Sequence, residues 1–393
     1  MSHLNPIALR SPVTARDPHE GGRVATNLEL LFDLVFVVAI ASNSAQLHHG
    51  IVASHWGTIV GYTMTWFAIW WAWMGYTWYA SAYDNDDVVF RWLSFVVMTG
   101  ALILAAGVPD IFADGQSLAV VAGYAVMRLG LVGLWLRAAK GDPAHRAVAI
   151  RYAVAVTLVQ LLWIARLAVP ESWLVPSFFL GVALELSVPM WAERSGQTPY
   201  HPHHVAERYG LLTIIVLGEV ILSGVQAVQV ALAEHGLVTD LIPLIVGALL
   251  IVFSVWWVYF KRAHHDMVEK PGVVWVFGYG HLLIFASVAA AGAGIAAAID
   301  VARHLDEATA TPTQIGLVIG AALAIFSVTL AGIHAINDRA DRGALVPGVT
   351  VAIGVLLIPL FDLSMGWTVL AQASVLTASV VVHVLRSQVH QAA

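Results

Sequence analysis

The sequence predicts an all-α, polytopic integral membrane protein with about twelve transmembrane helices. Of its 393 residues, 59% are hydrophobic and only 11% are charged, and the mean hydropathy is +0.78. Soluble domains carry about 25% charged residues. A membrane helix needs about 20 mostly apolar residues, because it must satisfy its own backbone hydrogen bonds. The apolar stretches are that long, and alternating strands of about ten residues are not seen.

The first half of the chain is predicted to form six spans. The first opens with ELLFDLVFVVAI, the second contains the aromatic run WFAIWWAWMGY, and the acidic loop DNDD separates the second span from the third. The spans cover residues 28–47, 56–79, 89–109, 117–137, 147–169 and 172–191. The segment 1–27 before them is polar and lacks an apolar core, so we expect a solvated cytoplasmic tail and no cleaved signal peptide.

Six further spans are predicted after a linker over residues 192–204. The seventh opens with HHVAERYGLLTIIVLGEVIL, the eighth holds LIVFSVWWVYF, and the ninth carries the small-residue run AAAGAGIAAA, which favours close helix packing. These spans cover residues 205–230, 238–260, 272–298, 314–334, 346–363 and 365–387, followed by a tail over 388–393. Around Gly366 the last two segments could instead form one re-entrant element, which would leave eleven helices.

The two halves share an order of features that indicates internal duplication. Each opens with a helix carrying a glutamate at its inner end, Glu29 or Glu207, and each has an aromatic helix followed by a charged loop. Residues 28–191 and 205–387 would then be two six-helix repeats. An even number of crossings gives both repeats the same orientation, as in many secondary transporters.

The distribution of Lys and Arg predicts the orientation. With the N-terminus inside, 16 of the 19 basic residues fall on the inner side, and the exceptions are Arg128, Arg166 and Arg303. The inner residues are Arg10, Arg16, Arg23, Arg91, Arg137, Lys140, Arg146, Arg151, Arg194, Arg208, Lys261, Arg262, Lys270, Arg339, Arg342 and Arg386. Both termini are therefore expected in the cytoplasm. This bias also explains the basic residues without a nucleic-acid partner.

Charges inside the spans are the strongest functional signal, because an ionisable residue at the centre of a membrane helix costs about 2.5–3.5 kcal/mol. At about 1.5 Å per residue, Asp33 lies about 8 Å and Glu219 about 18 Å from the inner end of its helix. Such groups normally face protein or water and have a partner. We expect Asp33 and Glu219 to belong to one substrate or proton site between the repeats, with Glu29 and Glu207 at its mouth and Arg91 beside it.

Structural explanations compete with this reading. Glu29 lies in a first helical turn, where the helix dipole favours an acid. Glu219 could form a static buried pair with Arg128 or His281, and Arg91 could be an ordinary interface cation that pairs with Asp87. Arg208 is a further candidate counter-charge, and Asp84 and Asp87 mark the acidic loop.

The sequence predicts no metal or cofactor. Its histidines in YHPHHVAER, His201, His203 and His204, and the pair His264 and His265 lie in segments without a recognised ligand spacing, so solvated loops are the better interpretation. His204 and Glu207 could share one face of a helix start. The absence of Cys excludes disulfides, iron–sulfur clusters and thiolate chemistry.

The tryptophans Trp70, Trp71 and Trp73 lie in the middle of the second span. Packing explains them better than an interfacial belt does. The alternative is that they line an aromatic cavity.

Three blocks, ELLFDLVFVVAI, WYASAYDNDDVVFR and HHVAERYGLLTIIVLGEVIL, resemble the bacterial low temperature requirement A (LtrA) family. The resemblance runs in the same order from about residue 24 to 387 and implies a bacterial inner-membrane protein linked to growth in the cold. It supplies no reaction. The matching motif positions are Glu29, Asp33, Asp84, Asp87, Arg91, Glu207, Arg208 and Glu219.

We therefore expect a secondary transporter or permease with a buried carboxylate site, acting on a small molecule or ion among membrane lipids. One alternative is a membrane enzyme acting on a lipid or isoprenoid-type substrate from the same acids. The other is a non-catalytic membrane protein. The sequence does not decide whether the protein is an enzyme, although it favours a protein that is not.

Overall fold

The computed structural model describes residues 8–18, 20–21, 23–236, 239–261, 265–270, 272–303, 309–337 and 345–392. Four residues used above, Arg262, His264, Arg339 and Arg342, lie outside these ranges. Within them the regular structure is all helical, as predicted. Ten helices are long and apolar enough to cross a membrane.

The described chain contains twelve helices of 13 to 34 residues and the four-residue α9. Their bounds are α1 Asn27–Val52, α2 Thr58–Tyr83, α3 Val88–Asp114, α4 Leu118–Gly141, α5 Arg146–Ala165, α6 Leu174–Ala192, α7 Pro202–His235, α8 Leu241–Phe260, α9 His265–Val268, α10 Val273–Ala302, α11 Pro312–Asn337, α12 Leu345–Leu357 and α13 Met365–Ala392. The two outside the ten candidate spans are the aromatic α2 and the short α12, which continues through a 3-10 turn to Phe361.

The chain divides into two compact units. The first comprises Met1–Asn43 and Met64–Arg208, and the second comprises Ser44–Thr63 and Tyr209–Ala393. Helices α1, α2 and α7 thus contribute residues to both units. The expected two-repeat relationship stays a prediction.

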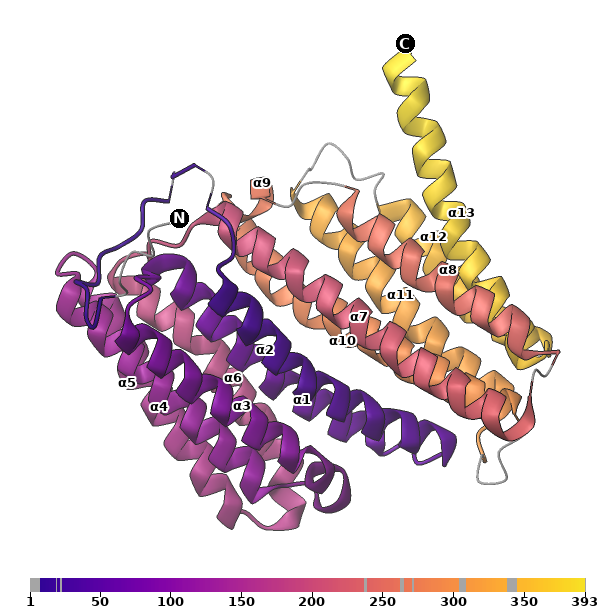
Figure 1. The fold of residues 1–393 in the computed structure, drawn as a ribbon, viewed down its shortest axis with the longest axis horizontal. Helices are drawn as coiled ribbons and strands as arrows, with labels where there is room; N and C mark the ends of the chain where they lie inside the picture. The colour runs from indigo at the N-terminus through magenta and orange to yellow at the C-terminus, as the bar shows by residue number, and fades with distance from the viewer. Residues whose placement is uncertain are drawn as a thin grey trace, which may run out of the picture. The chain divides into compact units, whose positions relative to one another are not determined.

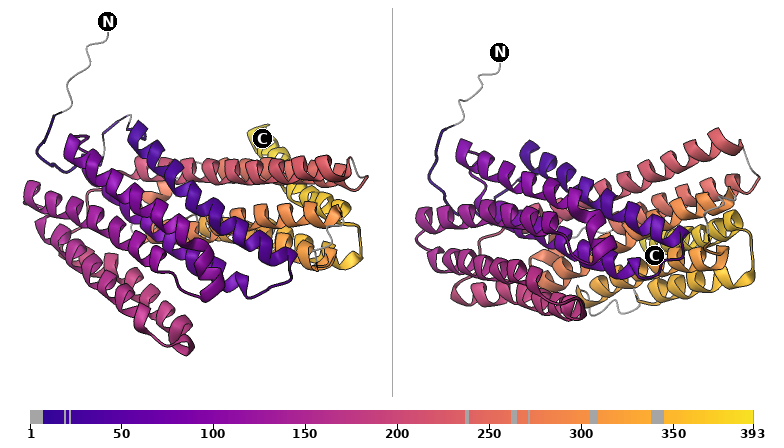
Figure 2. Two further views of the ribbon diagram at one scale, coloured as in Figure 1. Left: turned by 60° about the horizontal axis from the view of Figure 1, so that its bottom comes forward. Right: turned by 90° about the horizontal axis from the view of Figure 1, so that it is seen from below.

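In the first unit α3 packs directly on α4, α4 on α5, and α5 on α6. Glycines allow the close approach of α3 and α4, which run side by side in Figures 1 and 2. A Cβ added at Gly100 would lie 2.5 Å from the carbonyl oxygen of Gly123, and one at Gly123 would lie 2.5 Å from the backbone nitrogen of Leu104. Small residues are the usual solution where membrane helices touch by van der Waals packing.

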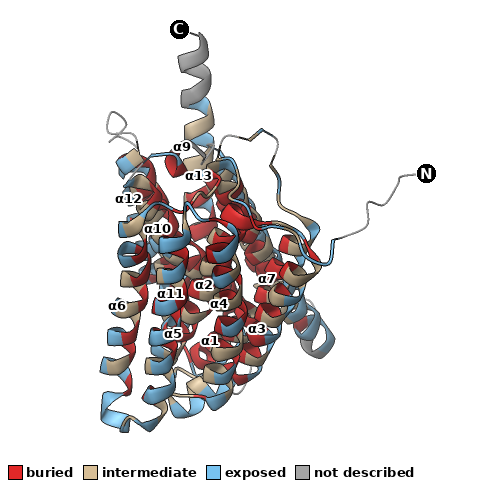
Figure 3. Ribbon diagram, turned by 90° about the vertical axis from the view of Figure 1, so that its left-hand side faces the viewer, coloured by how far each residue is buried: buried red, intermediate tan, exposed pale blue. Residues whose placement is uncertain are grey.

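The outward faces of α5 and α6 carry exposed residues in Figure 3. Many of them are large and apolar, including Leu158 and Leu161 on α5 and Phe179 and Leu180 on α6. Exposed apolar side chains of this kind are expected where lipid replaces water as the solvent. The exposed and buried faces of one helix are therefore both hydrophobic.

In the second unit α10 packs on α11, α11 on α12, and α8 on α13; the last two lie alongside each other in Figure 1. The small-residue run of α10 is buried, and a Cβ at Gly292 or Gly294 would lie 2.7 Å from Val220 or Ile319. This agrees with the predicted packing role. Helices α12 and α13 are separate elements, since a turn over residues 362–364 divides them.

Candidate functional site

The candidate site lies in the first unit and is built on the first turn of α1. Thr26 precedes the helix, and its backbone N–H and hydroxyl donate to one carboxylate oxygen of Glu29 at 2.9 and 3.0 Å. The backbone N–H of Glu29 in turn donates to the Thr26 hydroxyl at 3.3 Å. This reciprocal arrangement is a capping box, which satisfies N–H groups that a helix start leaves free. It explains locally why Glu29 stands where it does.

Asp33 lies one turn after Glu29 on the same face of α1, and both residues are completely buried. The first two turns of α7 supply a matching pair, His204 and Arg208, also four residues apart and completely buried. Two i,i+4 pairs on different helices therefore face each other. We call these four residues the α1–α7 cluster.

Arg208 bridges the two acids of the cluster. Its Nη2 lies 2.5 Å from Oδ1 of Asp33, its Nε donates to Oδ2 of Asp33 at 3.3 Å, and its Nη1 lies 2.9 Å from Oε1 of Glu29. His204 Nε2 lies 3.2 Å from Glu29, and the indole N–H of Trp73 on α2 donates to Asp33 at 2.7 Å. Helices α1, α2 and α7 are thus tied together by charge-assisted hydrogen bonds, which are stronger than neutral ones.

With both acids ionised, the charges of the cluster balance only if the imidazole is protonated. Two carboxylates face one guanidinium and one imidazole, so the net charge is −1 with a neutral His204 and zero with a protonated one. An uncompensated charge is costly in such a site, because burial removes the water that would otherwise solvate it. One proton gained or lost therefore changes the energy of the whole cluster.

A second layer of charge lies just outside the helices. Arg23 donates to the carbonyl oxygen of Ala80 at 2.9 Å, and its pKa is lowered by burial and by the charge of Arg16. Burial, together with the charge of Glu29, raises the pKa of Asp84 to about 6, against the opposing charges of Arg23 and Arg16. The acidic loop thus carries a carboxyl that titrates near neutral pH.

The described part of the polar segment before α1 lies against the helix ends. Ser11 N–H donates to Asp87 at 2.7 Å, Arg16 N–H donates to the carbonyl of Ala82 at 3.0 Å, and Ala25 N–H donates to Glu207 at 3.0 Å. Glu207 therefore fixes the backbone of the segment that leads into α1. It does not contact Asp33 through any hydrogen bond among the described residues.

One expectation about the histidines is wrong. His201 and His204 are buried, at 2% and 0% exposure, and do not lie in a solvated loop. His204 bonds to Glu29 and not to Glu207.

Arg91 does not pair with Asp87. It forms a two-point contact with Asp86, at 2.8 and 2.9 Å, on the exposed surface. Asp87 caps α3 through Phe90 N–H and pairs with Arg137 at 2.6 Å. Burial alone would raise the pKa of Asp87, but the hydrogen bonds from Arg137 and from the Ser11 and Phe90 N–H groups hold it below its ordinary value. Arg91 is thus separate from the α1–α7 cluster.

A second buried ionic group in this unit contains Arg128. Its Nη2 donates to Glu185 at 2.6 Å, and Glu185 also accepts from the indole N–H groups of Trp71 at 2.7 Å and Trp163 at 2.9 Å. Arg128 is therefore a counter-charge, but its partner is Glu185. Arg128, Glu185 and the two indoles thus satisfy one another within this unit.

In the second unit, His281 has both ring nitrogens engaged. Nε2 lies 2.9 Å from the Tyr259 hydroxyl and Nδ1 lies 2.7 Å from the carbonyl oxygen of Phe277. Glu219 is 8% exposed, and its Oε2 has no hydrogen-bond partner among the described residues. The expected pairing of His281 with Glu219 is not formed. The joining of Glu219 to the site of Asp33 stays a prediction.

The described residues contain no group of three or more His, Asp or Glu that could hold a metal ion. What the α1–α7 cluster can do chemically is exchange protons and change the strength of the contact between two helices. Sequence reasoning missed the roles of His204, Trp73 and Glu185. The signal for His204 was its spacing of four from Arg208, matching that of Glu29 and Asp33.

Comparisons with known proteins place this chain in a family. The model of the bacterial low temperature requirement A protein family matches residues 24–385. A protein of Rhizobium meliloti (strain 1021), described as uncharacterized, is 27% identical in an alignment of 281 positions that covers 66% of each chain; the match thus spans just under two thirds of that relative. No solved structure matches the chain. The family match covers almost every helix described above, so the chain belongs to the bacterial low temperature requirement A (LtrA) family.

Proposed function

We propose that the protein is a secondary transporter or permease of the bacterial inner membrane, in which the α1–α7 cluster couples protons to the movement of a small molecule or ion. The observation that carries the proposal is the buried pairing of two carboxylates with one guanidinium and one imidazole. Solvent-exposed ion pairs contribute little energy. Here a proton decides whether the buried charges cancel.

The coupling follows from the electrostatics of the cluster. With Asp33 and Glu29 ionised, Arg208 binds both and holds α1 against α7. Protonating one acid leaves a single pair and weakens the contact between the helices. A substrate that binds one arrangement of the helices more tightly then changes the affinity of the cluster for protons. Because the two equilibria are linked, proton binding changes the affinity for substrate by the same factor.

The proposed orientation puts the cluster at the cytoplasmic side with both termini. Basic residues gather at the same ends of the helices: Arg16 and Arg23 before α1, Arg137 and Lys140 at the end of α4, and Arg146 at the start of α5. Positive charge in short connections is typical of the cytoplasmic face. Protons would enter the cluster from that side.

The test measures proton movement in liposomes that contain the purified protein and an internal pH indicator. A panel of cationic, anionic and neutral metabolites is added outside under an imposed pH gradient. The wild-type protein is expected to move protons with at least one panel member, and Asp33→Asn is expected to abolish that movement. Asp86→Asn is the matched control, because it removes an exposed carboxylate with an arginine partner from the same unit.

Two outcomes would contradict the proposal. One is a wild-type protein that moves no protons with any class of solute. The other is an Asp33→Asn protein that couples as the wild type does. A further readout needs no substrate, because pH-induced infrared difference spectra report carboxyl protonation directly. The cluster's signal is expected in wild type and Asp86→Asn and not in the Asp33→Asn, Glu29→Gln double variant.

A further inference from the structure

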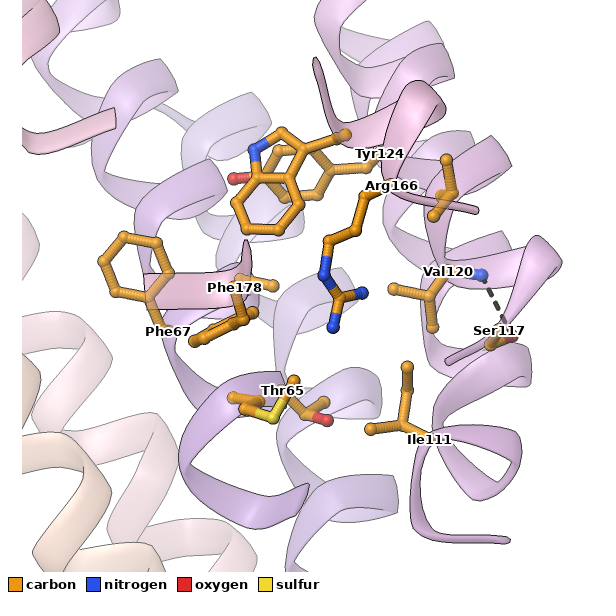
Figure 4. Close-up of a pocket in the computed structure, with 12 residues that line it drawn as sticks. Thr65, Phe67, Ile111, Ser117, Val120, Tyr124, Arg166 and Phe178 are labelled. Carbon is orange, nitrogen blue, oxygen red and sulfur yellow. Dashed lines mark hydrogen bonds between the residues drawn. The ribbon is translucent and has the colours of Figure 1, made fainter. Parts of the chain in front are cut away.

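A cavity of about 60 Å³ lies at the end of the first unit's helices that is opposite to the α1–α7 cluster. Helices α3 and α5 end there, and α4 and α6 begin there. Figure 4 shows Phe67, Ile111, Val120 and Phe178 around it. Pockets that enclose a drug-sized ligand have volumes of about 300–1,000 Å³. This cavity therefore suits one segment of a flexible chain and is too small for a whole metabolite.

Three polar groups of the cavity wall form hydrogen bonds with residues that do not line it. The Tyr124 hydroxyl accepts from Arg128 at 3.2 Å, and the Trp163 indole N–H donates to Glu185 at 2.9 Å. The Ser117 hydroxyl donates to Asp110 at 3.0 Å. The wall is therefore apolar except for Arg166 and the hydroxyl of Thr65, which has no hydrogen-bond partner among the described residues.

Arg166 is the charged residue of this wall, and it is only 7% exposed. Figure 4 shows its guanidinium directed into the space between Phe178 and Val120. Its Nη2 donates to the carbonyl oxygen of Leu174 at 2.8 Å, and its Nε donates to the Ser177 hydroxyl at 3.2 Å. Both acceptors are neutral, and Nη1 forms no hydrogen bond with any described residue.

Among the described residues, the charge of Arg166 is thus left without a counter-ion. The other two deeply buried arginines of this unit, Arg128 and Arg208, each bind a carboxylate at 2.6 Å or closer. Arg166 has no acid within 4.0 Å among the described residues. Its guanidinium carbon lies 6.0 Å from the ring centroid of Trp163 and 5.9 Å from that of Phe178. Ring faces offset part of the cost of a buried cation but do not neutralise it.

We propose that this cavity binds an anionic phospholipid. Its phosphate pairs with Arg166, and the end of one acyl chain enters the space lined by Phe67, Ile111 and Phe178. The site lies at helix ends, the depth at which lipid head groups meet a membrane protein. One phospholipid molecule thus supplies both the counter-charge that Arg166 lacks and the apolar chain that fills the cavity.

The competing explanation is that Arg166 only fastens α5 to α6 through Leu174 and Ser177. Arg151 on α5 provides the matched control for that role. It also donates to a backbone carbonyl, that of Trp191, and also lies over an aromatic ring, at 5.2 Å, but it does not line this cavity. A purely structural arginine would behave as Arg151 does.

The experiment measures lipid binding to the detergent-purified, full-length protein by native mass spectrometry. Phosphatidylglycerol and phosphatidylcholine of equal chain length are added at equal concentrations, with glycerol 3-phosphate and oleate in separate arms. The wild-type protein is expected to bind phosphatidylglycerol at least tenfold more tightly than phosphatidylcholine. Glycerol 3-phosphate is expected not to bind, because it lacks the chain.

Two variants separate the charge from the cavity. Arg166→Gln is expected to remove the preference for phosphatidylglycerol, and Val120→Phe is expected to weaken binding tenfold by filling the cavity while Arg166 remains. Arg151→Gln is expected to bind as the wild type. Size-exclusion profiles and circular dichroism confirm folding, and if Arg166→Gln fails to fold, Val120→Phe decides alone.

The proposal is overturned if wild type binds the two phospholipids equally, or if Val120→Phe retains full phosphatidylglycerol binding. Binding of oleate without binding of phosphatidylglycerol would also overturn it, since a free fatty acid would then be the ligand. None of these outcomes bears on proton coupling at Asp33.

Discussion

Arg208 holds Asp33 and Glu29 at the same time, with nitrogen–oxygen distances of 2.5 and 2.9 Å, in a site that excludes solvent. One guanidinium on α7 thus fixes two acids on α1. The acids sit four residues apart, so the arginine can reach both only when the two helices cross at this turn. The contact is therefore a property of the helix pair.

Removing the guanidinium should destabilise the protein strongly. Arg208→Met leaves two buried carboxylates without their cation, and breaking a buried pair from one side costs about 3–5 kcal/mol. Thermal unfolding in detergent should show a clearly lowered midpoint. Arg91→Met should change it little, because exposed pairs contribute at most about 1 kcal/mol and Arg91 pairs with Asp86 at the surface. Equal midpoints for the two variants would contradict this account.

Much of the stability that Arg208→Met loses should be recovered when the two acids are neutralised together with the arginine. The triple variant Arg208→Met, Asp33→Asn, Glu29→Gln contains no buried unpaired charge in the α1–α7 cluster. Its unfolding midpoint should lie above that of Arg208→Met alone, since removing all partners of a buried pair is far less harmful than removing one. A triple variant less stable than the single one would show that packing, and not charge, sets the cost.

Trp73 should contribute through one hydrogen bond. Its indole N–H donates to Asp33 at 2.7 Å, and hydrogen bonds to charged groups are worth about 1.5–3 kcal/mol. Trp73→Phe should therefore lower the stability measured by denaturant or heat, and a double-mutant cycle with Asp33→Asn should show coupling of that sign. Trp92→Phe serves as the control, because Trp92 is 65% exposed. A cycle without coupling would exclude the bond as the cause.

Asp84 should make stability fall as pH rises through about 6. Its pKa is raised from the ordinary 3.8 to about 6 in the folded protein, first by burial and then by Glu29. The folded state therefore holds this proton more tightly than the unfolded state, so the stabilisation is complete below about 4 and is lost as pH rises through 6. Unfolding midpoints measured from pH 4.5 to 8 should decline over this window, and Asp84→Asn should flatten the decline. A variant with the wild-type slope would rule out Asp84 as its origin.

The contact between α3 and α4 should tolerate no side chain at Gly100. An added Cβ would lie 2.5 Å from the carbonyl oxygen of Gly123, which is backbone and cannot move aside alone. Gly100→Ala should cost about 1–3 kcal/mol, as overpacking commonly does. Gly224→Ala on α7 is the matched control, because nothing lies within 4 Å of its added Cβ. There the helix propensity of alanine should leave stability unchanged or slightly raised.

The sequence by itself determined the all-helical fold, the membrane as its solvent and the face shared by Glu29 and Asp33. Those features depend on local chemistry: the length of apolar runs, a helical period that brings residues four apart onto one face, and a capping box within four residues. Spacing also placed His204 and Arg208 on one face of α7. It did not say which charges would meet.

Only the tertiary structure decided the partners. Arg128 binds Glu185 and not Glu219, Arg91 takes Asp86 and leaves Asp87 to Arg137, and His204 bonds to Glu29. Each choice depends on how helices far apart in sequence are rotated and how closely they pack. A glycine contact such as that of Gly100 with Gly123 or an apolar wall such as that around Arg166 forms only when those helices come together. Helical periodicity fixes a direction around one helix axis, while a buried ion pair needs the axes, rotations and depths of two helices at once.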